Sequence, residues 1–166
     1  ILGISGLMGS GRTELLTAIF GAWSGKTTGE ILLNGNKISF SSPTSAMKNG
    51  LALATEDRKR FGLDLNSSVG KNLSIASLKQ ISSMGILNFT KEQKRNSESV
   101  KSLSVKIKSE DDEVKTLSGG NQQKVVIGKW MLTNPQILFL DEPTRGVDVG
   151  AKAEIYSIIN DLKMKK

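Results

Sequence analysis

A glycine-rich segment at residues 6–13 places the strongest constraint on how this chain can fold. It reads Gly-Leu-Met-Gly-Ser-Gly-Arg-Thr and fits the phosphate-loop spacing G-x-x-x-x-G-K-[ST] except at the lysine, which is Arg12. We expect an apolar strand at residues 1–5 before it and a helix at residues 12–20 after it. The backbone of such a loop and the positive end of the helix dipole then face one anion, with contacts from Gly6, Gly9, Ser10, Gly11, Arg12 and Thr13. The alternative is an ordinary glycine-rich turn before a helix.

Arg12 and Thr13 predict different parts of that site. The arginine keeps the positive charge but replaces a compact ammonium with a longer planar fork, so it need not reach the β and γ phosphates as a lysine does. The Thr13 hydroxyl stands where such loops ligate Mg²⁺. We therefore expect nucleotide binding here, with poor hydrolysis.

A second candidate site follows the apolar segment at residues 137–140. Asp141 and Glu142 come directly after it, and the carboxyl ends of buried parallel strands are where ligands sit in open sheets. We expect Asp141 to hold Mg²⁺ and Glu142 to orient or deprotonate an attacking water. Acidic residues also serve as turn formers and helix caps at strand ends, which is the alternative.

The rest of the chain predicts a mixed α/β order. The Asn34-Gly35 pair within residues 29–40 predicts an antiparallel hairpin. Further elements are expected as a helix at residues 42–49 closed by Gly50, a strand at 51–55 that runs into the charged run 56–60, mostly helical structure between 67 and 115, a helix from Ser118 to about Asn134, and a final helix from about Val149.

Composition excludes several classes of site. The chain has no cysteine and no histidine, so disulfides, thiolate metal sites and histidine bases are absent, and chemistry must rest on carboxylates, amides and cations. No apolar run approaches the roughly 20 residues that cross a bilayer, so we expect a soluble, cytoplasmic chain. The net charge of +7 suits anionic partners, but few aromatic residues accompany it, which argues against a nucleic-acid platform.

The segment at residues 117–124, Leu-Ser-Gly-Gly-Asn-Gln-Gln-Lys, is the most specific motif in the chain. Ser118 and the glycines would open a helix whose bare N–H groups face outward and accept an anion at close range. The alternative is a common serine cap before a glycine-rich helix start. The segment resembles the signature motif of ATP-binding-cassette proteins, and the order of phosphate loop, signature and acidic strand end matches that family.

Three stretches narrow the resemblance to the second cassette of tandem ATPases in ribose, galactose and xylose importers: residues 56–59, 121–124 and 141–152. The resemblance implies an α/β fold of the P-loop NTPase, ATP-binding-cassette type, with a mostly parallel sheet, a small antiparallel unit and a helical subdomain. Residues 1–166 would form one cassette fragment, with the subdomain at about 67–117 inserted in a RecA-like core. The adenine-stacking aromatic would lie before Ile1 and the switch residue after Lys166.

The resemblance also implies roles for single residues. Glu56 takes the place of the Q-loop glutamine near Mg²⁺, so the expected metal ligands are Thr13, Glu56 and Asp141. Asp148 matches the aspartate of the loop between two cassettes, and residues 57–61 would lie towards the transporter. Each signature closes on nucleotide held by the other cassette, which assigns nucleotide contacts to Ser118, Gly119, Gly120, Asn121 and Gln122.

The function that the resemblance implies is ATP hydrolysis, with Mg²⁺, that drives uptake of a monosaccharide-like solute. The expected partners are the first nucleotide-binding domain of the same protein or a second copy, membrane permease subunits and, indirectly, a solute-binding protein, but no nucleic acid. The expected location is the inner face of the cell membrane. Two alternatives remain, a cassette switch without a transporter and an ATP-sensing module that does not hydrolyse.

Overall fold

Two short parallel strands form the centre of the computed structural model, which describes residues 1–7 and 9–164. β3 (Leu51–Ala54) pairs with β6 (Ile137–Leu140) in a register that sets Leu51 beside Ile137 and Ala54 beside Leu140. All four residues of β3 are buried, as expected for a strand covered on both faces. Both strands run in one direction, so the segments that follow them start at the same edge.

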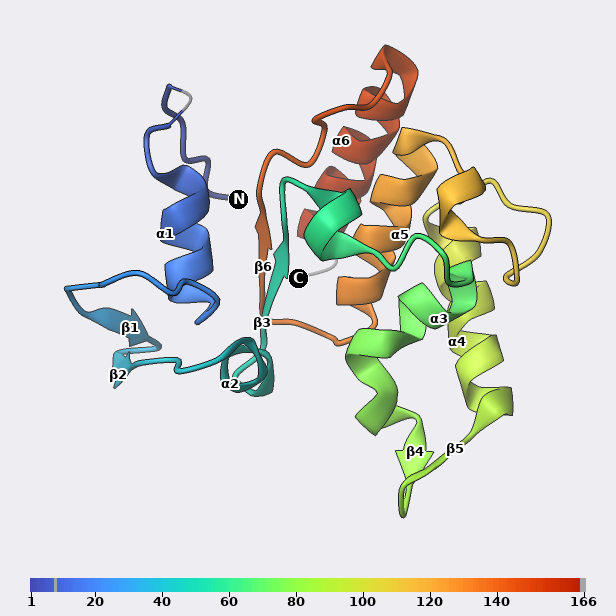
Figure 1. Cartoon of the computed structure of the whole chain (residues 1–166), viewed down its shortest axis with the longest axis horizontal. Coiled ribbons are helices and arrows are strands. Elements are labelled where there is room, and N and C mark those ends of the chain that lie inside the picture. The colour runs from blue at the N-terminus through green and yellow to red at the C-terminus, as the bar shows by residue number, and fades with distance from the viewer. Residues whose placement is uncertain (8, 165–166) are drawn as a thin grey trace.

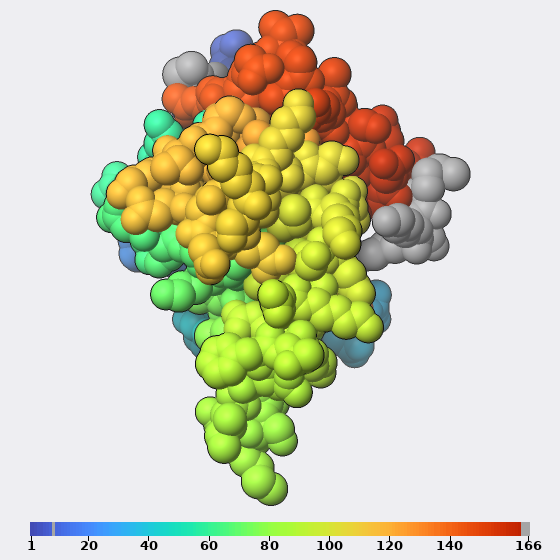
Figure 2. All heavy atoms as spheres, turned by 90° about the vertical axis from the view of Figure 1, so that its right-hand side faces the viewer, coloured from blue at the N-terminus to red at the C-terminus, as the bar shows by residue number. Residues whose placement is uncertain are grey.

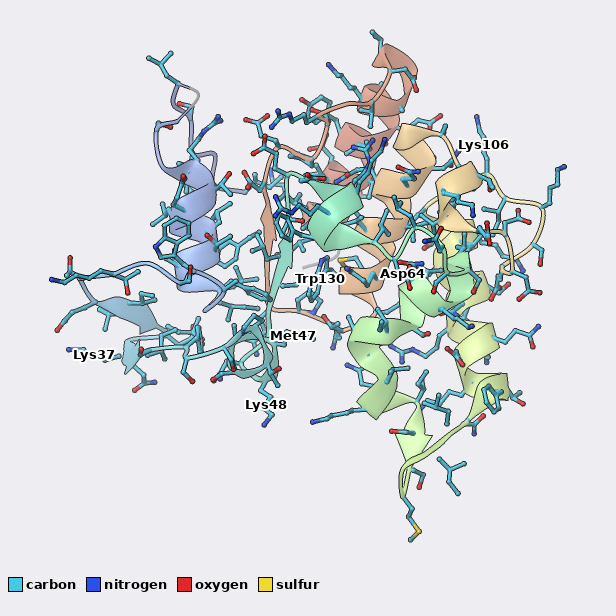
Figure 3. The ribbon with its side chains drawn as sticks, in the orientation of Figure 1. Lys37, Met47, Lys48, Asp64, Lys106 and Trp130 are labelled. Atoms are coloured by element: carbon cyan, nitrogen blue, oxygen red, sulfur yellow. The ribbon has the colours of Figure 1, made fainter. Side chains whose placement is uncertain are left out.

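Helices cover this strand pair on two sides (Figure 1). α1 (Arg12–Ile19) lies on one side, and α5 (Gly119–Met131) and α6 (Val149–Met164) lie on the other. Phe20, at the end of α1, packs edge-on against Trp130 of α5 with ring centroids 5.8 Å apart. Trp130 is labelled in Figure 3. A first apolar cluster thus joins α1, α2, both strands and the end of α5.

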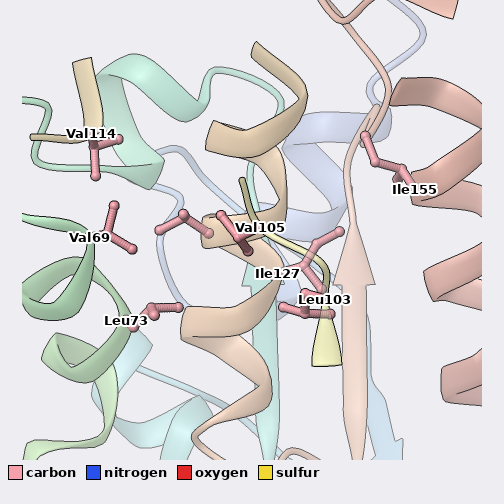
Figure 4. Packing of buried hydrophobic residues seen from close by; sticks show 8 residues of the cluster. Val69, Leu73, Leu103, Val105, Val114, Ile127 and Ile155 are labelled. Carbon is pink, nitrogen blue, oxygen red and sulfur yellow. The ribbon is translucent and has the colours of Figure 1, made fainter. Parts of the chain in front are cut away.

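α5 is the central helix of the second apolar cluster. Every residue from Gln122 to Lys129 is buried, and Val125 and Ile127 pack with residues from α3 and α6 (Figure 4). Lys124 is 2% exposed; its ammonium donates to the Ser104 carbonyl and pairs with Glu154. The hydrogen bond from Lys124 lowers the pKa of the Glu154 carboxyl. The buried ammonium of Lys124 therefore has both a carbonyl acceptor and a counter-ion, which offset the cost of burying its charge.

The segment between β3 and α5 is mostly helical, as expected. It holds a π-helical turn η1 (Arg58–Gly62), α3 (Val69–Ser74), a 3₁₀ stretch η2 (Ile75–Gln80), α4 (Phe89–Ser102) and a 3₁₀ turn η3 (Val114–Thr116). A small hairpin of β4 (Ser82–Ser83) and β5 (Ile86–Leu87), which was not expected, forms the narrow tip seen in Figure 2. Whether residues 67–117 make a separate inserted subdomain stays a prediction.

The local signals at residues 29–50 are confirmed. β1 (Ile31–Leu33) and β2 (Asn36–Ile38) form an antiparallel pair joined by Asn34 and Gly35, both at positive φ. α2 (Pro43–Lys48) starts at Ser42, whose hydroxyl accepts from the Ser45 N–H, and ends before Gly50 at φ +79°. Turn and cap chemistry therefore decides these elements.

The expected strand at residues 1–5 is wrong. These residues form no strand, and Ile1, Leu2 and Ile4 are largely exposed. A strand exists only when a neighbouring strand satisfies its N–H and C=O groups, and no described strand pairs with this segment. Among residues 1–7 and 9–164, no helix is long and apolar enough to span a bilayer.

Lys129 gives the fold a testable pH dependence. Burial lowers the pKa of its ammonium, which donates to the Gly62 carbonyl, from 10.5 to about 8. Between those two pH values the unfolded chain holds more protons at this residue than the folded chain does. The free energy of unfolding should therefore rise with pH across that window, by at most about 3 kcal/mol.

Denaturant unfolding of Lys129→Met between pH 7 and pH 11 checks this. The variant should lack that part of the rise, whereas the exposed-lysine control Lys48→Met should follow the wild type. Parallel pH profiles for wild type and Lys129→Met would contradict the assignment.

Candidate functional site

The glycine-rich loop adopts the shape that its glycines allow. Gly9 and Gly11 stand at φ +80° and +85°, and a Cβ at Gly6 would lie 2.5 Å from the Ser10 hydroxyl. Gly11 is the N-cap of α1 and supplies no side-chain cap, so Arg12 and Thr13 open the helix without a competing acceptor at this end. The first N–H groups of α1 are therefore oriented to receive an anion.

The three expected metal ligands come together from three elements. The Thr13 hydroxyl, in the first turn of α1, donates to an Asp141 carboxylate oxygen at 2.7 Å. It also lies 3.4 Å from a Glu56 carboxylate oxygen. Asp141 follows β6 and Glu56 follows β3, so the parallel register of these strands brings both carboxylates to one edge. Asp141 is only 6% exposed, which makes its bond to Thr13 part of the interior.

This donor set suits a hard cation. A hydroxyl and two carboxylates are the oxygen ligands that Mg²⁺ takes in phosphate sites, where water and substrate oxygens complete its shell. Within the described ranges, no three Asp, Glu, His or Cys side chains gather closely enough to hold a metal by themselves. Glu56 also forms an ion pair with Arg145. The residues fit a cation that is shared with bound phosphate.

Arg12 points to the expected catalytic carboxylate. Its guanidinium pairs with Glu142 at 2.7 Å, with side-chain exposures of 29% and 41%. Glu142 stands at φ +45°, a left-handed conformation that is uncommon outside glycine. Arginine in place of lysine therefore joins the loop directly to the acidic strand end.

The signature segment starts α5 as expected. The Ser118 hydroxyl accepts from the Asn121 backbone N–H and from its side-chain amide at 3.0 Å. The Asn121 side-chain oxygen accepts from the Lys106 N–H, which fixes the segment before α5 to its first turn. Figure 1 shows this helix start across the strand pair from the loop at residues 6–13. One chain thus presents two separate candidate half-sites.

The signature glycines are also required by packing within the chain, because a larger side chain at either position would meet neighbouring atoms. A Cβ at Gly120 would lie 2.4 Å from the Ala151 Cβ of α6, and one at Gly119 would lie 2.8 Å from an Arg58 nitrogen. Gln122 is 4% exposed, and its amide donates to the carbonyls of Val114 and Leu117. Contact of these residues with nucleotide stays a prediction; their packing within the chain is observed.

Asp148 comes directly before α6, whose Ala151 lies against Gly120 of the signature. Its carboxylate accepts from the Ala151 N–H at 2.9 Å, so it caps α6. The side chain remains exposed. Its expected place between two cassettes stays a prediction that this geometry permits.

Arg58 is the functional candidate that the sequence patterns did not single out. It lies in η1 and is 7% exposed, and burial lowers the pKa of its guanidinium. It borders a cavity of about 320 Å³ that is lined by Glu56, Asp57, Arg58, Lys59, Arg145 and Gly146. All five residues from 56 to 60 are charged, and only Arg58 among them is buried. The sequence alone does not distinguish this arginine from its exposed neighbours.

Comparison with known proteins gives consistent matches. The family model described as ABC transporter matches residues 1–145. A ribose import ATP-binding protein of Clostridium tetani is 52% identical over 98% of this chain, and a xylose import ATP-binding protein of Thermoanaerobacter pseudethanolicus is 51% identical over 98%. This chain covers 32% of the length of each relative.

Solved structures agree on the fold. A dimeric post-hydrolysis ATP-binding cassette bound to ADP and phosphate matches with a TM-score of 0.74 at 22% identity, over 94% of this chain and 66% of that one. A nucleotide-free cassette from an ABC transporter matches with a TM-score of 0.76 at 22% identity, over 95% of this chain and 63% of that one. The expected P-loop NTPase fold is confirmed.

Gly120→Ala tests the packing at the start of α5. The added methyl group meets Ala151 of α6, so the free energy of unfolding should fall by about 1–3 kcal/mol relative to Gly150→Ala. Gly150→Ala is the matched control, because a Cβ there has ordinary contact, 3.4 Å from Asp148, and both changes add the same helix-favouring methyl group. Equal stabilities of the two variants in urea unfolding would refute the contact.

Proposed function

The chain belongs to the ABC transporter family of ATP-binding domains, and we propose that it binds Mg·ATP and drives import of a monosaccharide-like solute. The supporting observation is the 2.7 Å bond between Thr13 and Asp141, which joins the phosphate loop to the acidic strand end across most of the sequence. Two relatives are named as ribose and xylose import ATP-binding proteins, and these names support a monosaccharide as the solute. Because the chain spans 32% of those proteins, these activities belong to a longer protein.

The proposed nucleotide half-site uses groups with separate tasks. The N–H groups at the start of α1 bind phosphate oxygens, and Thr13, Asp141 and Glu56 hold Mg²⁺. Mg²⁺ neutralises phosphate charge when bound. Glu142 orients and deprotonates water for attack on the γ-phosphate, once Arg12 has exchanged its carboxylate partner for phosphate.

The same ion pair supports an asymmetric pair of sites. Arg12 engages Glu142 directly, so the base of this half-site begins its cycle in an ion pair. Ser118, Gly119 and Gly120, at the start of α5, complete a second site on the other nucleotide-binding domain, and Figure 1 shows this helix start across the strand pair from the phosphate loop. This chain then contributes to hydrolysis chiefly through its signature.

The proposed partners follow from the exposed surface. The described part of the chain has no membrane-spanning helix, and large apolar side chains stand exposed between η1 and the start of α4: Phe61, Ile75, Leu78, Met84, Ile86 and Phe89. Exposed apolar side chains of this kind favour contact with another protein. We assign these exposed side chains to contacts with permease subunits at the inner face of the membrane, with a solute-binding protein acting through them.

Thr13→Val tests the Mg²⁺ site. Valine keeps the shape and removes the hydroxyl, so the affinity for Mg·ATP should fall by about tenfold or more, whereas binding in EDTA should change by less than about threefold. The measurement is photo-crosslinking of azido-ATP to the full-length protein, with labelled peptides assigned to this segment. An equal loss with and without Mg²⁺ would count against Thr13 as a ligand.

The asymmetry is tested at Ser118, which is exposed and caps α5. Ser118→Asp and Ser118→Asn both keep a cap, but only aspartate places a negative charge before the phosphate. In the full-length protein we expect Ser118→Asp to lower ATPase activity by about tenfold or more, with Ser118→Asn and Arg12→Ala losing much less. Loss of activity in Arg12→Ala together with retention in Ser118→Asp would reverse the assignment.

A further inference from the structure

Arg58 occupies a position between the two half-sites of this chain. Its Nη1 donates to the Arg145 carbonyl at 2.8 Å and its Nη2 to the Gly146 carbonyl at 3.1 Å. Its Nε lies 3.4 Å from the side-chain oxygen of Gln122. One buried guanidinium therefore holds the loop after β6 against the first turns of α5.

Two glycines leave room for this guanidinium. A Cβ at Gly119 would lie 2.8 Å from the Arg58 Nη2 and 2.8 Å from the Gly146 carbonyl oxygen. Gly146 stands at φ +66°, a conformation that other residues rarely adopt. The loop, the arginine and the signature thus meet at a point where no side-chain atom from residue 119 fits.

The hydrogen-bond partners of Arg58 contact different half-sites on its two sides. Arg145 pairs with Glu56, whose carboxylate reaches Thr13 in the phosphate loop. Gln122 lies on the helix that Ser118 caps, and it bonds to the carbonyls of Val114 and Leu117 before the signature. The path from phosphate loop to signature runs through Arg58.

The planar guanidinium of Arg58 suits the positions of its three oxygen acceptors. The three hydrogen bonds of the guanidinium go to uncharged oxygens in two separate segments, which a planar fork can reach at once and a single ammonium cannot. Such charge-assisted bonds in the interior are strong, and loss of one partner leaves buried polar groups unpaired. A movement of the loop after β6 therefore has to move Arg58 or break these bonds.

We propose that Arg58 is a positioning residue that ties the orientation of the signature turn to the chain's own nucleotide half-site, so that the two composite ATP sites act interdependently. The coupling rests on the proposed function. The physical link between the two segments does not, and it is measured separately.

The link is tested first by amide hydrogen exchange in the full-length protein without nucleotide. Arg58→Met should speed exchange by about tenfold or more both at residues 145–148 and in the first turn of α5, because both lose the same anchor. Arg58→Lys should lie between Arg58→Met and wild type. The matched control is Arg95→Met, because Arg95, which lies on α4, also donates to a backbone carbonyl, that of Leu132. It should leave both segments unchanged.

The coupling is then tested by ATP hydrolysis in the reconstituted transporter. Arg58→Met should lower kcat by about tenfold or more with a KM for ATP within about threefold of wild type, and its Hill coefficient should fall towards one. Arg95→Met should keep the wild-type kcat and Hill coefficient. A purely structural role would lower thermal stability in both variants without changing cooperativity.

The outcomes separate the two ideas. Faster exchange at residues 145–148 alone overturns the link, and a normal Hill coefficient in Arg58→Met overturns the coupling. If the wild-type protein neither binds nor hydrolyses ATP, the proposed function fails, and with it the coupling, while the exchange measurement still decides whether Arg58 joins the two segments.

Discussion

Leu51 pairs with Ile137 and Ala54 with Leu140, and this parallel register sets the positions of two carboxylates beside the phosphate loop. The register makes β3 and β6 end at one edge, which delivers Glu56 and Asp141 to the same hydroxyl of Thr13. A slip of one strand by one residue would turn that strand's side chains to the opposite face. The apolar packing of Leu51 and Leu53 against α1 and α2 opposes that slip, so core and site depend on one pairing.

Features encoded by neighbouring residues could be predicted from the sequence. Asn34-Gly35 specified its hairpin, and Ser42 and Ser118 each marked a helix start, because turn and cap preferences act over two to four residues. The fold class followed from the resemblance. The β4–β5 hairpin escaped because Met84 holds φ +51° before Gly85, and methionine gives no turn signal.

Features made by distant residues could not be read in the same way. The segment at residues 1–5 has strand composition but no described strand beside it, so composition alone misled. Arg58 looked like one charge among five, and only the fold shows that it turns inward to the carbonyls of Arg145 and Gly146. The Arg12–Glu142 pair likewise joins residues that are far apart in the chain. Each loop had a predicted chemistry, but the contacts between loops required the tertiary structure.

The edge-on contact of Phe20 with Trp130 spans from the end of α1 to the end of α5. Trp130 is partly buried, whereas Trp23, the chain's other tryptophan, is 45% exposed. The emission of Trp130 therefore depends on whether the helix behind the phosphate loop stays in place against the helix that carries the signature. With Trp23 replaced by phenylalanine, the tryptophan emission of this chain reports whether α1 and α5 stay in contact.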